Sequence, residues 1–448
     1  MKGRPDTAIR KFTGTVAARI FAAVSCISAV FAAVSCEKHA ASSLPTPYPE
    51  TIDKVLIMYS AGQNNLAAAL AEDIGDLCGG YLPRSRDRVL FLSYQRLNSR
   101  YTTSVAESYL IRYSIFNGRL AADTLKRFPA DMNAASAATM NEVLTYVRDN
   151  FPAGSYGMLF SSHATGWLPA GYYSNSSYYD NLYGTGRQAM PAGIGGETCV
   201  PLVIPERDPA LPPVKSIGAD YVYGASGMVS YEMDLREFAA ALPMHMDYIF
   251  FDCCLMGGIE VAYELRDRCD RIIFSPTEVL AEGFDYRTMG ERLLRSGAPD
   301  LEGICRDYYE YYSNHEDGGY MRSATVSLVD CAGTGHLAEV CRRIFDNHRD
   351  GLAGIMPDEV QQYYTGRYHW FYDLYDIAVH AGASGEELAE LQDAIDGCII
   401  YKAATDRFLG IPIETSCGLS MYLPCNGSAY LDNEYRKLAW NQAAGLVM

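Results

Sequence analysis

The stretch HMDYIFFDCCLMGGIEVAYELR, His245–Arg266, decides the fold of this chain. Its apolar run Tyr248–Phe251 has the character of a buried strand and ends at Asp252–Cys254. Apolar residues then recur at helical spacing over Leu255–Tyr263, which predicts a strand that passes directly into a helix. The N-terminus of a helix favours an anion and lowers the pKa of a cysteine placed there. The sequence therefore predicts a nucleophilic thiol at this junction.

A second stretch, YGMLFSSHATGW at Tyr156–Trp167, has the same organisation: a short apolar run, then a reactive side chain, His163, then a loop. In an open parallel sheet the ligand crevice lies at the carboxyl ends of the strands, so side chains at the ends of two neighbouring strands meet over one crevice. We expect His163 and one cysteine of the Cys253-Cys254 pair to form a Cys-His dyad there.

These residues carry a family resemblance. FDCCLMGGIEVAYELRD resembles the signature of the clostripain-type cysteine peptidases (family C11), and SSHATGW resembles their histidine motif, D-H-G-G-G-W. Further matches are KVLIMYSAGQNNLAAALAEDI (54–74), SPTEVLAEGFDY (275–286), TVSLVD (325–330) and GLSMYLP (418–424). The likeness covers most of the chain beyond residue 50, and aligning its most specific block identifies Cys254 as the nucleophile rather than Cys253.

The resemblance implies a fold and a chemistry. The fold is α/β: a caspase-like three-layer sandwich with a mostly parallel central sheet covered by helices, plus a C-terminal α/β extension. Cys254 attacks the scissile carbonyl, with His163 as its general base and as acid for the leaving amine. The backbone N–H groups of Cys254 and Ala164 form the oxyanion hole. Here the chain departs from the family, because Ala164 and Thr165 replace glycines, and Cys253 replaces an alanine and is assigned to packing.

Specificity is a separate expectation. Relatives cleave after arginine, sometimes lysine, and the resemblance assigns Asp252 to the S1 pocket, with Glu278 or Glu282 as a second carboxylate. The plainer interpretation of Asp252 is a cap for the following helix. Two alternatives stay open: a non-catalytic surface lipoprotein that uses the fold as a binding module, and a peptidase of the same type with a non-basic P1 preference.

The N-terminus predicts export. Basic residues, an apolar stretch and Ala33–Cys36 resemble a bacterial lipoprotein signal, which implies a lipid anchor at Cys36 in the cell envelope; an ordinary secretory signal or an uncleaved anchor is the alternative. The expected organisation is a signal peptide (1–36), a Ser/Pro-rich tether (37–50), a catalytic domain (51–297) with a long loop (168–228), and a C-terminal α/β portion packed on the catalytic domain (298–448). Within that last portion, apolar spacing predicts a helix at Glu386–Lys402.

Composition limits the partners. A net charge of −17 argues against nucleic acid, and the 13 cysteines show no zinc-type spacing, so the expected partners are protein or peptide substrates and, through the anchor, a membrane. No cofactor or metal is required for the chemistry. The resemblance adds calcium, for which the acidic turn Asn314–Gly318 is the candidate, and cleavage of the long loop on activation. Candidate cleavage positions follow Arg187, Arg207 and Lys215.

Overall fold

The computed structural model describes residues 46–101, 103–170, 172, 199–201, 217–224, 227–315, 321–364 and 370–448, and residues 47–448 form one compact unit. The predicted signal peptide with Cys36, and the candidate cleavage residues Arg187, Arg207 and Lys215, lie outside the described residues. Among the described helices, none combines the length and the apolarity needed to cross a bilayer.

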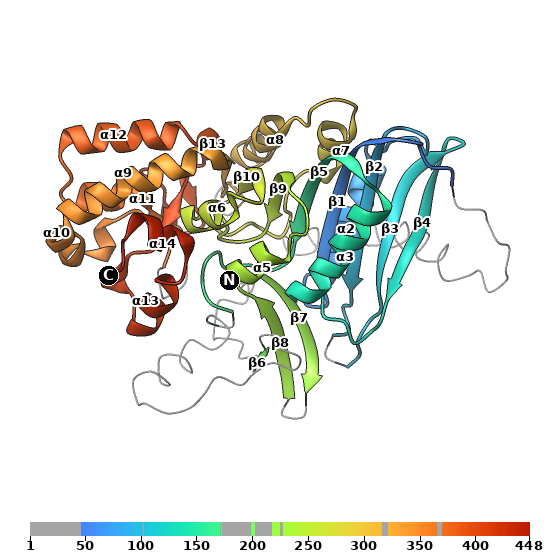
Figure 1. Ribbon diagram of the computed structural model, residues 1–448, viewed down its shortest axis with the longest axis horizontal. Helices are drawn as coiled ribbons and strands as arrows, with labels where there is room; N and C mark the ends of the chain where they lie inside the picture. The colour runs from blue at the N-terminus through green and yellow to red at the C-terminus, as the bar shows by residue number, and fades with distance from the viewer. Residues whose placement is uncertain are drawn as a thin grey trace, which may run out of the picture. The chain divides into compact units, whose positions relative to one another are not determined.

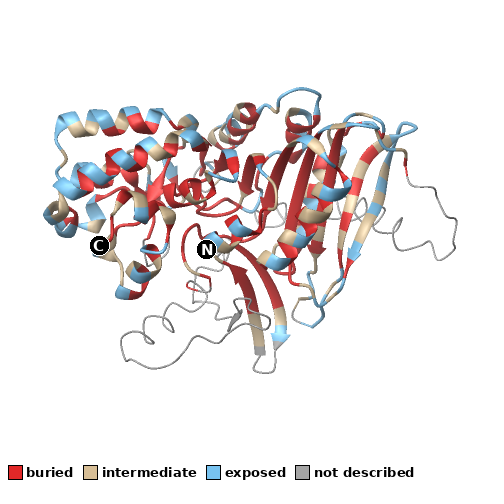
Figure 2. Cartoon of the chain, in the orientation of Figure 1, coloured by how far each residue is buried: buried red, intermediate tan, exposed pale blue. Residues whose placement is uncertain are grey.

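A nine-stranded mixed sheet forms the centre of the molecule (Figure 1). Its spatial order is β13 (Ile399–Ala404), β11 (Thr325–Asp330), β10 (Cys269–Phe274), β9 (Met246–Asp252), β5 (Ala153–Ser161), β1 (Ile52–Gly62), β2 (Val89–Leu97), β3 (Ser108–Phe116), β4 (Arg119–Phe128). The five strands from β10 to β2 are parallel, and the strands on both sides of this block are antiparallel. The central strands are nearly continuous apolar runs because both of their faces are buried (Figure 2).

Helices cover both faces of this sheet. One face packs on α2 (Ala67–Gly79), α7 (Tyr286–Leu294) and α8 (Leu301–Ser313). The other packs on α3 (Ala137–Asn150), α5 (Leu235–Ala241), α6 (Ile259–Leu265) and α9 (Thr334–Asn347). Alternate strand residues supply the two cores: Met58, Leu159 and Phe250 point to the α2/α7 face, whereas Tyr59, Phe160 and Phe251 point to the other. The predicted three-layer architecture is confirmed.

The C-terminal part of the chain contributes two strands to the same sheet, β11 and β13. The prediction of a helix at Glu386–Lys402 is wrong in its second half. Helix α12 (Gly385–Asp396) ends before Gly397, and the residues of β13 then pair with β11. The other C-terminal elements are α10 (Arg349–Gly354), α11 (Leu374–His380), α13 (Ala429–Tyr435), α14 (Ala439–Ala444) and the short strands β12 (Tyr372–Asp373), β14 (Arg407–Phe408), β15 (Ile411–Pro412) and β16 (Ser420–Met421).

A separate three-stranded sheet extends from the body beside α5 (Figure 1). It consists of β6 (Cys199–Pro201), β8 (Gly227–Met233) and β7 (Ile217–Gly224). The segment predicted as one long loop, 168–228, is therefore not a loop throughout. Two hydrogen bonds of 2.9 Å hold strand β7 to the end of β1. Tyr221 N–H donates to Gln63 O, and Gln63 Nε2 donates to Tyr221 O.

Candidate active site

The cysteine pair lies in a turn between β9 and α6. Helix α6 begins at Ile259, five residues after Cys254, so the expectation of a thiol directly at the helix N-terminus is wrong. The turn contains Leu255 at φ 60°, a left-handed conformation that a leucine adopts only where its surroundings hold it. Two hydrogen bonds of 2.8 Å do so, from Leu255 N–H to Thr277 O and from Gly257 N–H to Ser275 O.

The two cysteines have different surroundings. Cys253 Sγ donates to Phe160 O at 3.3 Å, and burial raises the pKa of this thiol well above its ordinary value. Cys254 is 7% exposed, and its Sγ accepts a hydrogen bond from Val279 N–H at 3.4 Å. Cys254 therefore faces the segment that follows β10, whereas Cys253 packs against β5.

His163 follows β5 by two residues and is 2% exposed. Its Nε2 lies 2.8 Å from Asn65 Oδ1, and its backbone carbonyl accepts a hydrogen bond of 2.9 Å from Gly218 N–H of β7. With the amide oxygen of Asn65 as acceptor, Nε2 carries the hydrogen and Nδ1 is the nitrogen that takes up a proton. Asn65 is thus an orienting residue that the sequence analysis did not single out.

Strand register relates His163 to Cys254. Strands β5 and β9 are parallel neighbours in which Ser161 pairs with Asp252, and the two candidate residues each stand two positions further along. Their loops touch: Gly166, at φ 58°, approaches so closely that a Cβ there would lie 2.5 Å from Leu255 O. Only glycine fits both this conformation and this contact.

The residues around Gly166 are tightly packed. Ala164 is fully buried, Thr165 is nearly so, and Trp167 packs between Tyr422 and Tyr435 with ring centroids 4.8 and 4.9 Å apart. The predicted oxyanion-hole position, Ala164, therefore belongs to a buried and closely packed loop.

Asp252 ends β9 with a partly exposed side chain that accepts a short hydrogen bond from the Tyr286 hydroxyl. Burial raises the pKa of this carboxyl, and the Tyr286 hydrogen bond opposes the rise. The Asp252 carboxylate is thus hydrogen-bonded to the Tyr286 hydroxyl rather than to the backbone N–H groups of a helix. Of the other predicted carboxylates, Glu278 is buried next to Val279, and Glu282 is exposed.

No metal ligand set is evident in the part of the chain that the structure describes, where no group of three His, Cys, Asp or Glu side chains is placed to hold an ion. The candidate calcium turn ends outside it, since residues 316–320 are not described. Calcium stays a prediction.

Fold and site together define a class: a caspase-like α/β protein with a cysteine and a histidine at the carboxyl ends of adjacent parallel strands. The model of the clostripain family, Peptidase_C11, matches residues 213–445. The chain therefore belongs to the clostripain family and is a cysteine-type endopeptidase by class. A search of curated proteins finds no match.

Solved structures support the fold. An inactive zymogen C11 protease from Parabacteroides distasonis superposes with a TM-score of 0.67 at 24% identity, covering 89% of this chain and 99% of that one. A secreted C11 cysteine protease from Bacteroides thetaiotaomicron, "iotapain", gives 0.67 at 21% identity, covering 88% and 100%. A secreted C11 cysteine protease from the same organism in complex with an irreversible peptide inhibitor gives 0.65 at 21% identity, covering 88% and 99%.

Proposed function

We propose that this protein is an exported endopeptidase that hydrolyses peptide bonds after basic residues, with Cys254 as nucleophile and His163 as general base. The observation that carries the proposal is the register of β5 and β9, which sets the two residues at equivalent positions of adjacent strand ends, in loops that touch at Gly166 and Leu255.

In the proposed reaction the Cys254 thiol gives its proton to His163, and the sulfur attacks the carbonyl carbon of the substrate. The C–N bond breaks, the amine leaves with the proton from His163, and an acyl group remains on Cys254. Water then attacks this thioester, with His163 taking its proton, and the carboxylic acid product and the free thiol are released. Backbone N–H groups at Cys254 and Ala164 stabilise the oxyanion of both tetrahedral intermediates.

Asp252 is the proposed determinant of basic specificity, because its carboxylate is partly exposed and has no cationic partner among the described residues. The guanidinium of a P1 arginine or the ammonium of a P1 lysine supplies the positive charge that pairs with the Asp252 carboxylate. Glu278 and Glu282 remain the candidates predicted from the sequence for a second carboxylate.

The test is hydrolysis of peptide amides with P1 arginine, lysine, aspartate and alanine by the exported protein. Cys254→Ala abolishes turnover, whereas the matched control Cys253→Ala keeps it. Turnover confined to the basic substrates supports the proposal; equal turnover of all four contradicts the specificity. A lack of turnover, even after limited proteolysis between residues 173 and 215, favours the binding-module alternative, for which the replaced glycines at Ala164 and Thr165 are the supporting observation.

We also propose export with a lipid anchor at Cys36. The leader supports it, and one structural relative is described as secreted. Cys36→Ser is expected to move the protein from the membrane fraction to the soluble fraction and to abolish incorporation of labelled fatty acid. Retention in the membrane would instead indicate an uncleaved anchor.

A further inference from the structure

The imidazole of His163 has a hydrogen-bonding partner that the predicted dyad does not include. Asn65 lies in the turn between β1 and α2, and its Oδ1 is 2.8 Å from His163 Nε2. His163 is 2% exposed, so this contact is made at a ring that water hardly reaches. A catalytic base that is oriented by a third group presents one fixed nitrogen to its nucleophile. Asn65 has the position of such a third group.

The Asn65 side chain is not engaged in capping the helix that follows it. An asparagine next to a helix start usually bonds the backbone of the first turn. Asn64 does so, since its Oδ1 accepts a hydrogen bond of 2.8 Å from Leu66 N–H. Asn65 is exposed, and its amide oxygen is directed to His163 instead. Local helix capping therefore does not account for the conformation of this side chain.

Strand β7 holds both partners of the contact in place. On one side Asn64 Nδ2 donates to Ala219 O at 2.7 Å, which fixes the turn that carries Asn65. On the other side Gly218 N–H donates to His163 O at 2.9 Å. Two consecutive residues of one strand thus bind the two loops whose side chains meet.

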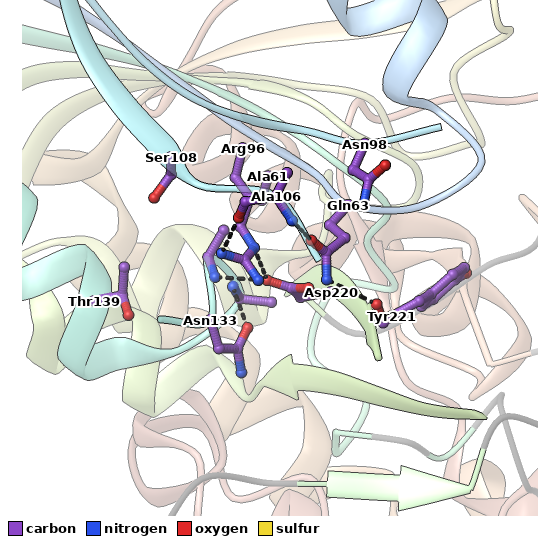
Figure 3. Close-up of polar contacts among 12 residues, drawn as sticks. Ala61, Gln63, Arg96, Asn98, Ala106, Ser108, Asn133, Thr139, Asp220 and Tyr221 are labelled. Carbon is purple, nitrogen blue, oxygen red and sulfur yellow. Dashed lines mark hydrogen bonds and ion pairs between the residues drawn. The ribbon is translucent and has the colours of Figure 1, made fainter. Parts of the chain in front are cut away.

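A serine strengthens this arrangement directly before His163. Ser162 Oγ donates to Ala61 O at 2.7 Å and accepts from Ala219 N–H at 3.1 Å, so it joins the ends of β1 and β5 to β7. Strand β7 is itself held to β2 by a buried ion pair with Arg96 (Figure 3). Buried groups therefore set the geometry of the asparagine–histidine contact.

We propose that Asn65 is a positioning residue that makes the catalytic unit three-membered: Cys254, His163 and Asn65. The inference rests on the proposed function and deepens it. The Asn65 amide oxygen accepts the hydrogen of Nε2, which leaves Nδ1 as the nitrogen that exchanges a proton with the thiol. When His163 takes up the thiol proton, Nε2–H becomes a stronger donor. The same hydrogen bond then stabilises the imidazolium and, with it, the Cys254 thiolate.

Other titratable groups lie on the elements that contact the His163 loop. Asp220 of β7 is neutralised by its ion pair, and Asp252 of β9 accepts a hydrogen bond from a tyrosine hydroxyl. Burial raises the pKa of the Tyr221 phenol and of the Cys253 thiol. A substitution of the asparagine alters none of these four side chains, so a shift of the pH profile reports on the imidazole and its thiol partner.

The experiment follows alkylation of Cys254 by iodoacetamide against pH, by mass spectrometry, because this reaction needs no peptide substrate. For Asn65→Ala we expect the rate at pH 7 to fall about 10-fold and the midpoint of the profile to rise by about one pH unit, since the imidazolium loses a stabilising hydrogen bond. Asn65→Asp supplies a charged acceptor, so its midpoint is expected below that of the parent protein. The matched control is Asn98→Ala, whose side chain bonds Ser104 O at 2.9 Å and leaves the profile unchanged.

Hydrolysis of a P1-arginine amide gives a second measurement. Asn65→Ala is expected to lower kcat about 10- to 100-fold and to leave KM within about 3-fold, because Asn65 contacts the base and not the substrate. Asn65→Asp is expected to recover most of the loss. Because Asn65 is exposed, denaturant unfolding is expected to show the same midpoint for both variants as for the parent protein.

An alkylation profile that Asn65→Ala leaves unchanged would give Asn65 a merely structural role and overturn the inference. An Asn65→Asp variant that behaves like Asn65→Ala would also overturn it, because the amide would then act as a donor. In both cases Cys254 still reacts faster than a packed thiol such as Cys305, so the proposed function stands. A parent protein whose Cys254 alkylates no faster than Cys305 would contradict the proposed dyad, and the inference with it.

Discussion

Two aspartates near the carboxyl ends of the central strands differ in how their charges are compensated. Asp220 of β7 is 0% exposed and forms an ion pair with Arg96, whose Nε lies 2.7 Å from its carboxylate (Figure 3). The same carboxylate accepts a hydrogen bond of 2.8 Å from Ala134 N–H. Arg96, also buried, donates from Nη1 to Ala106 O at 2.9 Å and from Nη2 to Ala130 O at 3.1 Å. Asp252, by contrast, accepts a hydrogen bond from the Tyr286 hydroxyl and forms no ion pair among the described residues.

The difference separates a structural charge from one available to a ligand. The Arg96–Asp220 pair neutralises its own charges and holds β7 to β2 and to the segment before α3, so no net charge remains at this position. Asp252 forms no ion pair among the described residues, and burial raises the pKa of its carboxyl, so its charge is costly to the fold and available to a cation. A buried carboxylate is therefore informative about function only together with its partners.

The largest effect is expected from Arg96→Met, which leaves Asp220 buried without its cation. Breaking such a pair on one side costs about 3–5 kcal/mol of the free energy of unfolding. Denaturant unfolding of the variant measures this loss. Adding Asp220→Asn is expected to recover part of it, because the stranded charge is removed. A loss below about 1 kcal/mol would show that Asp220 is compensated in some other way.

The same kind of change at the other aspartate is expected to affect activity rather than folding. Asp252→Asn lowers kcat/KM for P1-arginine amides by about 100-fold or more, or about 2.7 kcal/mol, because the guanidinium loses its charged partner. Alkylation of Cys254 by iodoacetamide keeps its rate, since the thiol and His163 are untouched. Parallel losses in hydrolysis and alkylation would instead place Asp252 in the support of the Cys254 turn.

Sequence reasoning found the parts of this site that have a local pattern. The β9 strand and its cysteines, and the β5 strand with His163, are visible as apolar runs that end in reactive side chains. Asn65 and Tyr286 were not assigned to the site, because each has an ordinary local role and joins it only through a contact with another element.

Pairing between distant strands also explains the error in the C-terminal part. Helical spacing continues past Asp396, and a single sequence offers no sign that residues from Ile399 onward pair with β11. Such tertiary pairing overrides local periodicity.

Glu260 of α6 provides an intermediate case: a fully buried carboxylate that is hydrogen-bonded but has no described cation. It accepts from Tyr422 N–H at 2.9 Å and from the Tyr435 hydroxyl at 2.8 Å, and burial raises its pKa to about 7. The Glu260 carboxyl binds a proton more tightly in the folded protein than in the unfolded chain. Its protonation therefore adds to the free energy of unfolding at low pH, and this contribution is lost as pH rises through 7.

Glu260→Gln keeps the acceptor and removes the titration. The difference in unfolding free energy between the parent protein and this variant is therefore expected to fall by about 2 kcal/mol between pH 5 and pH 8. Denaturant titrations at several pH values measure it. A difference that does not change with pH would mean that Glu260 ionises as easily in the folded protein as in the unfolded chain.

The smallest expected effect on stability, that of Asp73→Asn, has the opposite sign to that of Arg96→Met. Burial raises the pKa of the Asp73 carboxyl on α2 in the folded state, and the charges of Asp252, Glu72 and Asp76 raise it further. At pH above the ordinary carboxyl range the unfolded chain carries this charge freely, whereas the folded protein carries it at a cost or takes up a proton. Asp73→Asn removes that cost, so we expect it to raise the free energy of unfolding by about 1 kcal/mol at pH 8 and to leave it unchanged below pH 4.

Asp76→Asn, which removes only an exposed ion pair, changes stability by less than about 0.5 kcal/mol at either pH. If Asp73→Asn destabilised the protein at pH 8, Asp73 would resemble Asp220, a charge satisfied within the fold. A gain in stability at pH 8 would instead identify Asp73 as a charge that the fold leaves uncompensated.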